Sequence, residues 1–168
     1  MQRMNKKMML LLTLLCIAVS MMAQDFTGRV YECKDMGTIR QYMQNELKDD
    51  PDVKDMSKDM KDFMGLLINS ITMEMSVTFK SGQKLQTKAK SSVNTEYLKN
   101  RGADWLDRQL IKYCAKELAS DFKDTYPYII KNGVIETEED DFYIINGGEA
   151  LEIRDPDSGI ALRFLRIK

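Results

Sequence analysis

The 168-residue chain contains no histidine, which limits the chemistry that its other side chains can perform. A serine or cysteine nucleophile usually needs an imidazole as its general base, and histidine is the commonest side chain that binds transition metals. Catalysis by carboxylates, lysine or tyrosine stays open, but no spacing in the sequence singles out such residues. We therefore predict no catalytic residues, no metal site and no cofactor.

A row of methionines could instead bind an apolar molecule. Met56, Met60 and Met64 stand four residues apart, so they share one face of a helix. Methionine is unbranched and polarizable, and it repacks around ligands of different shape. The alternative is that this row is the buried stripe that any core-facing helix requires.

Aromatic side chains gather around a predicted helix and the strand that follows it. The candidates for lining a ligand pocket are Tyr97, Trp105, Tyr113 and Tyr128. Rings with a polar tip can line such a pocket, but they also seal the packing of a helix on a sheet. No second feature of the sequence converges on them, so both interpretations stay open.

Two acidic segments contain the residue types that bind calcium. Five of the six residues over 136–141 are carboxylates, and Asp155 and Asp157 precede Gly159. An EF-hand loop needs a glutamate at its twelfth position, which counted from Asp155 is Arg166. We therefore predict solvated turns at both places and no cation site.

The first two dozen residues are typical of a signal for export. Arg3, Lys6 and Lys7 precede an apolar run over 8–19, and Ala23 offers a small residue for cleavage. The run is shorter than the roughly 20 residues of a membrane-spanning helix. We predict a signal peptide over 1–23 and an exported product, periplasmic or extracellular, with no membrane span.

Cleavage would leave a single domain over 24–168. Of the 25 basic side chains 22 would remain against 26 acidic ones, which gives a net charge of −4. A domain with this charge lacks the basic surface that nucleic-acid binding requires, so we predict no nucleic-acid partner.

The three cysteines differ in their expected fates. Cys16 follows Leu14 and Leu15, which are too bulky for a lipidation site, so we do not expect a lipid anchor. Cys33 lies in a strand-like segment and Cys114 on the apolar side of a helix. In an oxidising compartment these two could form a disulfide, and two separately buried thiols are the alternative.

The spacing of apolar residues predicts strands and helices in the first two thirds of the mature chain. A β-rich stretch over 26–34 is followed by helical spacing over 39–47 and 53–71, with Asp50 and Pro51 between the two helices. Alternation over 73–80 and 85–90 predicts a hairpin. Asp104 is the expected N-cap of a further helix. The apolar face of that helix comprises Leu106, Leu110, Tyr113, Cys114, Leu118 and Phe122.

The remainder of the chain reads as strands separated by turns, over 126–131, 134–138, 142–145, 150–154 and 160–168. Asn132-Gly133 between the first two is a strong hairpin signal. With no βαβ alternation, the sequence predicts an α+β fold. Its core would be an antiparallel meander of about eight strands, with helical insertions after the first and third strands.

Phe26-x-Gly28 at the start of the first strand, followed by a run of hairpins, resembles the lipocalin-like (calycin-type) domains of secreted bacterial proteins. The resemblance implies an up-and-down β-barrel that encloses a small apolar ligand. Lipocalins have tryptophan where this chain has Val30, and the helical insertions fit no lipocalin pattern. An incomplete barrel, or an open sheet packed against helices, is therefore the alternative.

Three functions follow as hypotheses. The first is a binding module for a small apolar or amphipathic ligand, which the resemblance implies. The second is a structural or interaction protein that binds another envelope protein. The third is a carboxylate-based hydrolase, which needs two acids facing each other across a cleft.

Overall fold

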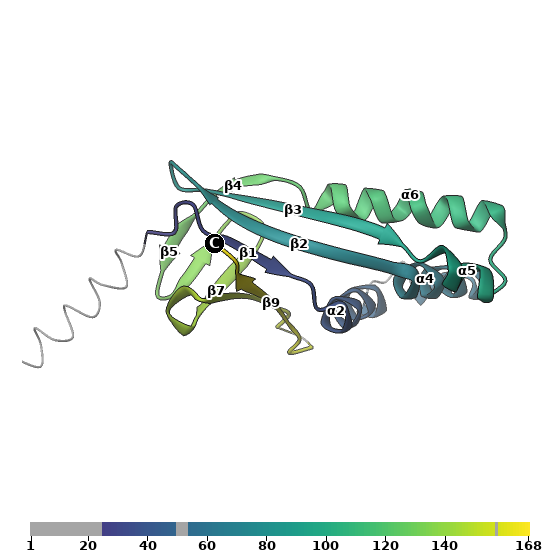
Figure 1. Ribbon diagram of the computed structural model, residues 1–168. Coiled ribbons are helices and arrows are strands. Elements are labelled where there is room, and N and C mark those ends of the chain that lie inside the picture. The colour runs from purple at the N-terminus through teal and green to yellow at the C-terminus, as the bar shows by residue number, and fades with distance from the viewer. Residues whose placement is uncertain (1–24, 50–53, 157) are drawn as a thin grey trace, which may run out of the picture.

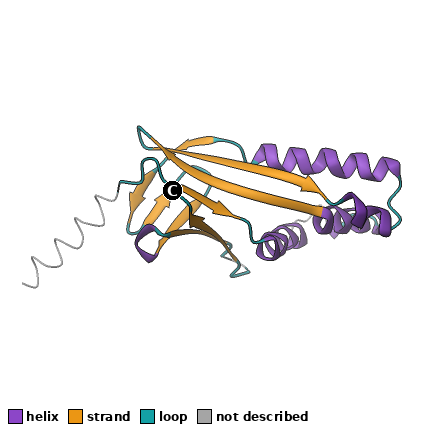
Figure 2. Cartoon of the chain, in the orientation of Figure 1, coloured by secondary structure: helices purple, strands orange, loops and turns teal. Residues whose placement is uncertain are grey.

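The computed structural model describes residues 25–49, 54–156 and 158–168. The predicted signal peptide, with Cys16, lies outside the described residues, as do Asp50, Pro51 and Asp157. Four α-helices lie within the described ranges (Figures 1 and 2): α2 (Met36–Asp49), α4 (Lys58–Ser70), α5 (Thr95–Asn100) and α6 (Trp105–Asp121).

Nine strands of the described chain form one antiparallel sheet. They are β1 (Val30–Cys33), β2 (Ile71–Lys80), β3 (Lys84–Val93), β4 (Thr125–Pro127), β5 (Ile129–Lys131), β6 (Val134–Glu136), β7 (Asp141–Ile145), β8 (Ala150–Arg154) and β9 (Ala161–Arg166). A short 3-10 helix, η1 (Asn146–Gly148), joins β7 to β8. The structure thus confirms the predicted α+β class, the antiparallel pairing and the helical insertions after the first and third strands.

The strand order is β4-β3-β2-β1-β9-β8-β7-β6-β5. Strands that follow each other in sequence are neighbours in the sheet, except β4 and β5, and the first strand pairs with the last through Tyr31 and Arg166. The two edge strands, β4 and β5, are consecutive in the chain and are separated only by Tyr128. The sheet therefore curls into a nearly closed barrel.

The one strand predicted over 126–131 is divided in two. Pro127 ends β4, which pairs with β3, whereas Ile129 begins β5, which pairs with β6. Between them the backbone N–H of Tyr128 donates to Gln83 O at 3.0 Å, and the Tyr128 side chain is buried. The apolar pattern of this segment correctly predicted extended backbone. It did not predict that the first part pairs with β3 and the second part with β6.

A long hairpin connects the barrel to the helices. β2 and β3 pair over ten residues each, from Ile71↔Val93 to Lys80↔Lys84. Only part of β2 also pairs with β1, and the remainder extends toward α4, α5 and α6 (Figure 1). α6 returns along β3, so the molecule has a barrel at one end and a group of helices at the other.

Aromatic rings fill the barrel interior. Phe79 packs against Phe26, Tyr31 and Tyr128, with ring centroids 5.0, 5.8 and 5.2 Å apart. The Tyr31 hydroxyl donates a buried hydrogen bond of 2.7 Å to Gly148 O, so its polar tip is satisfied. Further along the barrel, Phe142 and Phe164 meet edge to face at 6.1 Å. These rings are buried and pack against one another inside the barrel.

The buried face of α6 matches the predicted one only in part, through Cys114, Leu118 and Phe122, which are half-buried and pack against the core. Ile111 and Ala115 are buried, and α6 lies along β3. Leu106, Leu110 and Tyr113 instead leave 56%, 45% and 63% of their surfaces exposed. The predicted apolar face is therefore covered toward the end of α6 and exposed toward its start.

Candidate functional site

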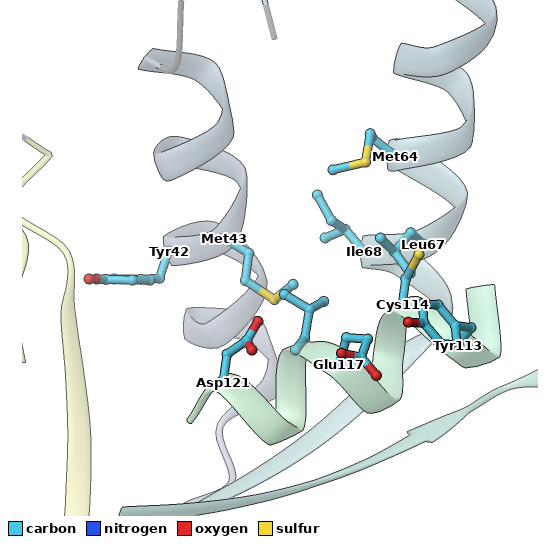
Figure 3. A pocket seen from close by; sticks show the side chains of 10 residues that line it. Tyr42, Met43, Met64, Leu67, Ile68, Tyr113, Cys114, Glu117 and Asp121 are labelled. Carbon is cyan, nitrogen blue, oxygen red and sulfur yellow. The ribbon is translucent and has the colours of Figure 1, made fainter. Parts of the chain in front are cut away.

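Three helices enclose an apolar pocket outside the barrel (Figure 3). It has a volume of about 470 Å³, is partly open to solvent and lies between α2, α4 and α6. The lining side chains are Tyr42, Met43, Met64, Leu67, Ile68, Tyr113, Cys114, Glu117, Leu118 and Asp121. We call this pocket the helix groove.

The α4 wall follows from helical spacing. Ser57 caps the helix by accepting a hydrogen bond from the Met60 backbone N–H at 3.3 Å. Met64, Leu67 and Ile68 lie three and four residues apart, so they form one face of α4. Leu67 and Ile68 are buried, whereas Met64 is half-buried at the groove.

The α6 wall mixes apolar and acidic side chains. Asp104 and Asp107 form a capping box that fixes the start of the helix, with Asp107 N–H donating to Asp104 at 2.9 Å. Further along, Tyr113, Glu117 and Asp121 are spaced at intervals of four, so they lie in a row on one face.

The α2 wall is tied to α4 by an arginine. Arg40 donates from Nε to Ile68 O at 3.3 Å and from Nη2 to Ile71 O at 3.2 Å. These carbonyls lie near the end of α4 and would otherwise lack a helical partner. Met43 enters the groove from α2 and Met64 from α4, as Figure 3 shows.

The charges on the lining side chains are all negative. Of the residues that line the groove within the described part of the chain, Glu117 and Asp121 are acidic and none is basic. Both carboxylates come from one face of one helix and do not oppose each other across the groove. This arrangement does not provide the paired acids of a glycoside hydrolase.

The structure separates the residues that the sequence suggested for a ligand pocket. Met64 and Tyr113 line the helix groove, whereas Met56 is half-buried and Met60 is 47% exposed, and neither lines it. The other three candidates lie elsewhere: Tyr97 beneath the Arg101 guanidinium at 5.5 Å, Trp105 68% exposed at the start of α6, and Tyr128 in the barrel core.

Several lining residues were not predicted as site residues. Tyr42, Met43, Leu67 and Leu118 were recognised only as members of apolar helix stripes. No sequence pattern indicates that Glu117 and Asp121 line a pocket, because isolated acids on a helix normally face water. Helical periodicity identifies an apolar face, but it does not say which faces of distant helices meet.

Both cysteines of the described chain are free thiols. Cys33 is buried at the end of β1, and burial raises the pKa of its thiol, so it stays protonated. Cys114 is half-buried and lines the helix groove, where it presents a small apolar surface.

The most strongly paired carboxylate lies outside the groove lining, on the outer wall of the barrel. Glu152 is 7% exposed and accepts hydrogen bonds from Arg163 Nε at 2.9 Å and Arg154 Nη2 at 3.0 Å. The hydrogen bond from Arg163, assisted by Arg154, holds the pKa of Glu152 below its usual range. This ion pair joins β8 to β9 and leaves no carboxyl proton for acid catalysis near neutral pH.

Neither a metal cluster nor a membrane-spanning helix lies within the described residues. No group of three or more His, Cys, Asp or Glu side chains there could hold a metal ion. None of the helices there is both long enough and apolar enough to cross a membrane. Comparison of the chain with known protein families, with curated proteins and with solved structures found no match.

Proposed function

We propose that the protein is an exported binding module that holds a small apolar or amphipathic molecule in the helix groove. The observation that carries this proposal is the apolar pocket of about 470 Å³ between α2, α4 and α6. Pockets for small ligands typically have volumes of about 300–1,000 Å³, with a mostly apolar lining and a few polar groups.

The position of the groove departs from what the lipocalin resemblance implied. The barrel interior is filled by Tyr31, Phe79, Phe142 and Phe164, each buried. The barrel in this proposal is a scaffold, and the helices inserted between its strands form the binding site.

Flexible side chains on two walls suit this role. Met43 on α2 and Met64 on α4 both point into the groove (Figure 3). A thioether side chain has several low-energy conformations, so the pair can adjust to ligands of different shape.

The test compares two methionines on the same helix. N-phenyl-1-naphthylamine, a neutral fluorescent apolar probe, is titrated into the wild-type protein and into the Met64→Gln and Met60→Gln variants. We expect Met64→Gln to weaken binding about tenfold, because it places an amide in the apolar groove. Met60→Gln is the control, because Met60 is 47% exposed and does not line the groove. Equal affinities in all three proteins would refute the proposal.

A second candidate function is binding to another protein, which the exposed apolar side chains of α6 favour. Leu106 and Leu110, which do not line the groove, expose 56% and 45% of their surfaces on the same helix. Contiguous exposed apolar side chains often mark a protein interface. Native mass spectrometry of protein purified from its own host distinguishes the two functions, because a small added mass indicates a ligand and a subunit-sized mass indicates a partner.

The export component of the proposal rests on Arg3, Lys6, Lys7, the apolar run that follows and Ala23. N-terminal sequencing of protein from the native host should begin at Gln24. An intact Met1, or a lipid-modified Cys16 as first residue, would refute it.

A further inference from the structure

We infer that the molecule held in the helix groove is a cationic amphiphile, whose positive group lies against Glu117 and Asp121. The inference rests on the proposed function and adds to it the charge of the ligand.

The lining of the groove carries only negative charge. Glu117 and Asp121 lie four residues apart on one face of α6, and none of the described lining side chains is basic. Like charges at this spacing destabilise a helix. A cation bound between them would remove this repulsion, whereas an anion would add to it.

The position of the two acids on α6 also favours a cation. Glu117 and Asp121 lie near the C-terminal end of α6, and no basic residue occupies its last turn. The free carbonyl groups at a helix C-terminus carry partial negative charge, which favours cations there. The carboxylates and the helix end therefore concentrate negative potential at one end of an apolar groove.

An aromatic ring lines the groove beside the acids. Tyr113 precedes Glu117 by four residues on the same face, lines the groove and is 63% exposed. The face of an aromatic ring attracts a positive group, above all a quaternary ammonium. Tyr113, Glu117 and Asp121 thus form a row in which each member favours a positive head group.

The side chains around the groove near α2 are also mainly negative in charge. Tyr42 lines both the groove and a neighbouring hollow, whose other lining side chains include Glu139 and Asp141. The basic residue of that hollow, Arg154, is engaged by Glu152 at 3.0 Å and lies 4.3 Å from the centroid of the Tyr143 ring. The neighbourhood therefore attracts a cationic head group and repels an anionic one.

The experiment measures how affinity depends on the charge of the ligand. Dodecyltrimethylammonium and dodecyl sulfate, which share a chain length and differ in the sign of the head group, are titrated by calorimetry below their micellar concentrations. The neutral probe N-phenyl-1-naphthylamine reports separately on the apolar groove. We expect the wild-type protein to bind the cationic amphiphile at least about tenfold more tightly than the anionic one.

The test variant is Glu117→Gln/Asp121→Asn, which keeps the shapes of both side chains. We expect it to weaken binding of the cationic amphiphile about three- to tenfold, as for partly exposed ion pairs, and to leave the neutral probe unaffected. Glu96→Gln/Glu138→Gln is the matched control: it changes the net charge equally, at two exposed positions that do not line the groove. This control should retain the wild-type preference.

The outcomes separate the two proposals. If wild type binds the neutral probe but shows no preference between the two amphiphiles, or if the test variant keeps the preference, the inference is refuted and the proposed function stands. If no probe binds, or if Met64→Gln leaves all affinities unchanged, the proposed function is refuted and the inference with it.

Discussion

The barrel and the helical end of the molecule differ in how completely their apolar side chains are buried. In the barrel, Phe79 is buried and touches three other aromatic rings. In the helical end, Leu106, Leu110 and Tyr113 are about half exposed, and the apolar faces of three helices leave a groove of about 470 Å³ between them. Apolar side chains that are close-packed hold a shape, whereas those that are left partly uncovered can bind another molecule.

The barrel interior and the groove lining also differ in the types of their side chains. The barrel interior consists mainly of rigid rings and branched residues such as Ile135 and Leu151. The groove has methionines on two of its walls and carboxylates on the third. Rigid rings favour a single packing arrangement, while methionines tolerate several, so the two regions differ in how readily they accept a new neighbour.

The largest expected effect tests whether the barrel is a filled core. Phe79→Ala should lower the free energy of unfolding by about 3–5 kcal/mol, because it removes a fully buried ring and leaves a cavity. Urea unfolding followed by circular dichroism measures this loss. A cost below about 1 kcal/mol would show that the interior relaxes easily and would weaken the contrast with the groove.

The next effect concerns the polar contact inside the barrel. Tyr31→Phe removes the hydroxyl that donates to Gly148 O at 2.7 Å and leaves this carbonyl unsatisfied in the core. We expect a loss of about 1–3 kcal/mol in the free energy of unfolding. An unchanged urea midpoint in Tyr31→Phe would indicate that water reaches this carbonyl and that the barrel is less closed than described.

A third prediction concerns the outer wall of the barrel and depends on pH. The pKa of Glu152 is lowered in the folded chain from its ordinary value of 4.5. Its ionised form therefore stabilises the fold above pH 4.5, and that contribution disappears as the pH falls through the lowered pKa. Glu152→Gln should lower the free energy of unfolding by about 1–2 kcal/mol at pH 7, because it removes the charge that pairs with two arginines. The loss stays this small because both arginines are partly exposed and screened by solvent.

The pH series provides the control for this prediction. Unfolding of wild type and Glu152→Gln is compared from pH 7 down to pH 3, and the difference between them should shrink only below pH 4.5. A difference that stays constant across this range would mean that the carboxylate acts through packing and not through its charge.

The smallest effect belongs to the helical end. Leu106→Ser should change the free energy of unfolding by no more than about 0.5 kcal/mol, because this side chain is 56% exposed. Binding of N-phenyl-1-naphthylamine should also be unchanged, because Leu106 does not line the groove. A loss above about 2 kcal/mol would show that another part of the protein covers this face, and the contrast between the two regions would fail.

Local features of the fold were predictable where the backbone itself requires particular residues. Asn132 and Gly133 have φ angles of 54° and 79°, the left-handed conformations that a tight hairpin turn requires and that these two residue types tolerate. Asp104 caps α6 as predicted, because its side chain accepts the hydrogen bond of an otherwise unpaired backbone N–H.

The candidate site was predictable only in part. The four-residue spacing of the methionines pointed to Met64, and the aromatic cluster pointed to Tyr113, but the same patterns also included Met60, Trp105 and Tyr128, which lie elsewhere. A stripe of apolar residues is a property of one helix, whereas a pocket is a property of several helices together. The spacing of apolar residues on α2 does not predict that α6 lies across the groove from it.

The sequence by itself determined the positions of most elements and turns and the antiparallel character of the sheet, because these depend on interactions between residues close in the chain. Only the tertiary structure decided that aromatic rings pack inside the barrel, that residues 126–131 divide between the two edge strands β4 and β5, and that the apolar face of α6 is exposed toward the start of the helix. These outcomes depend on which distant surfaces meet, and many pairings of apolar surfaces satisfy the same local pattern.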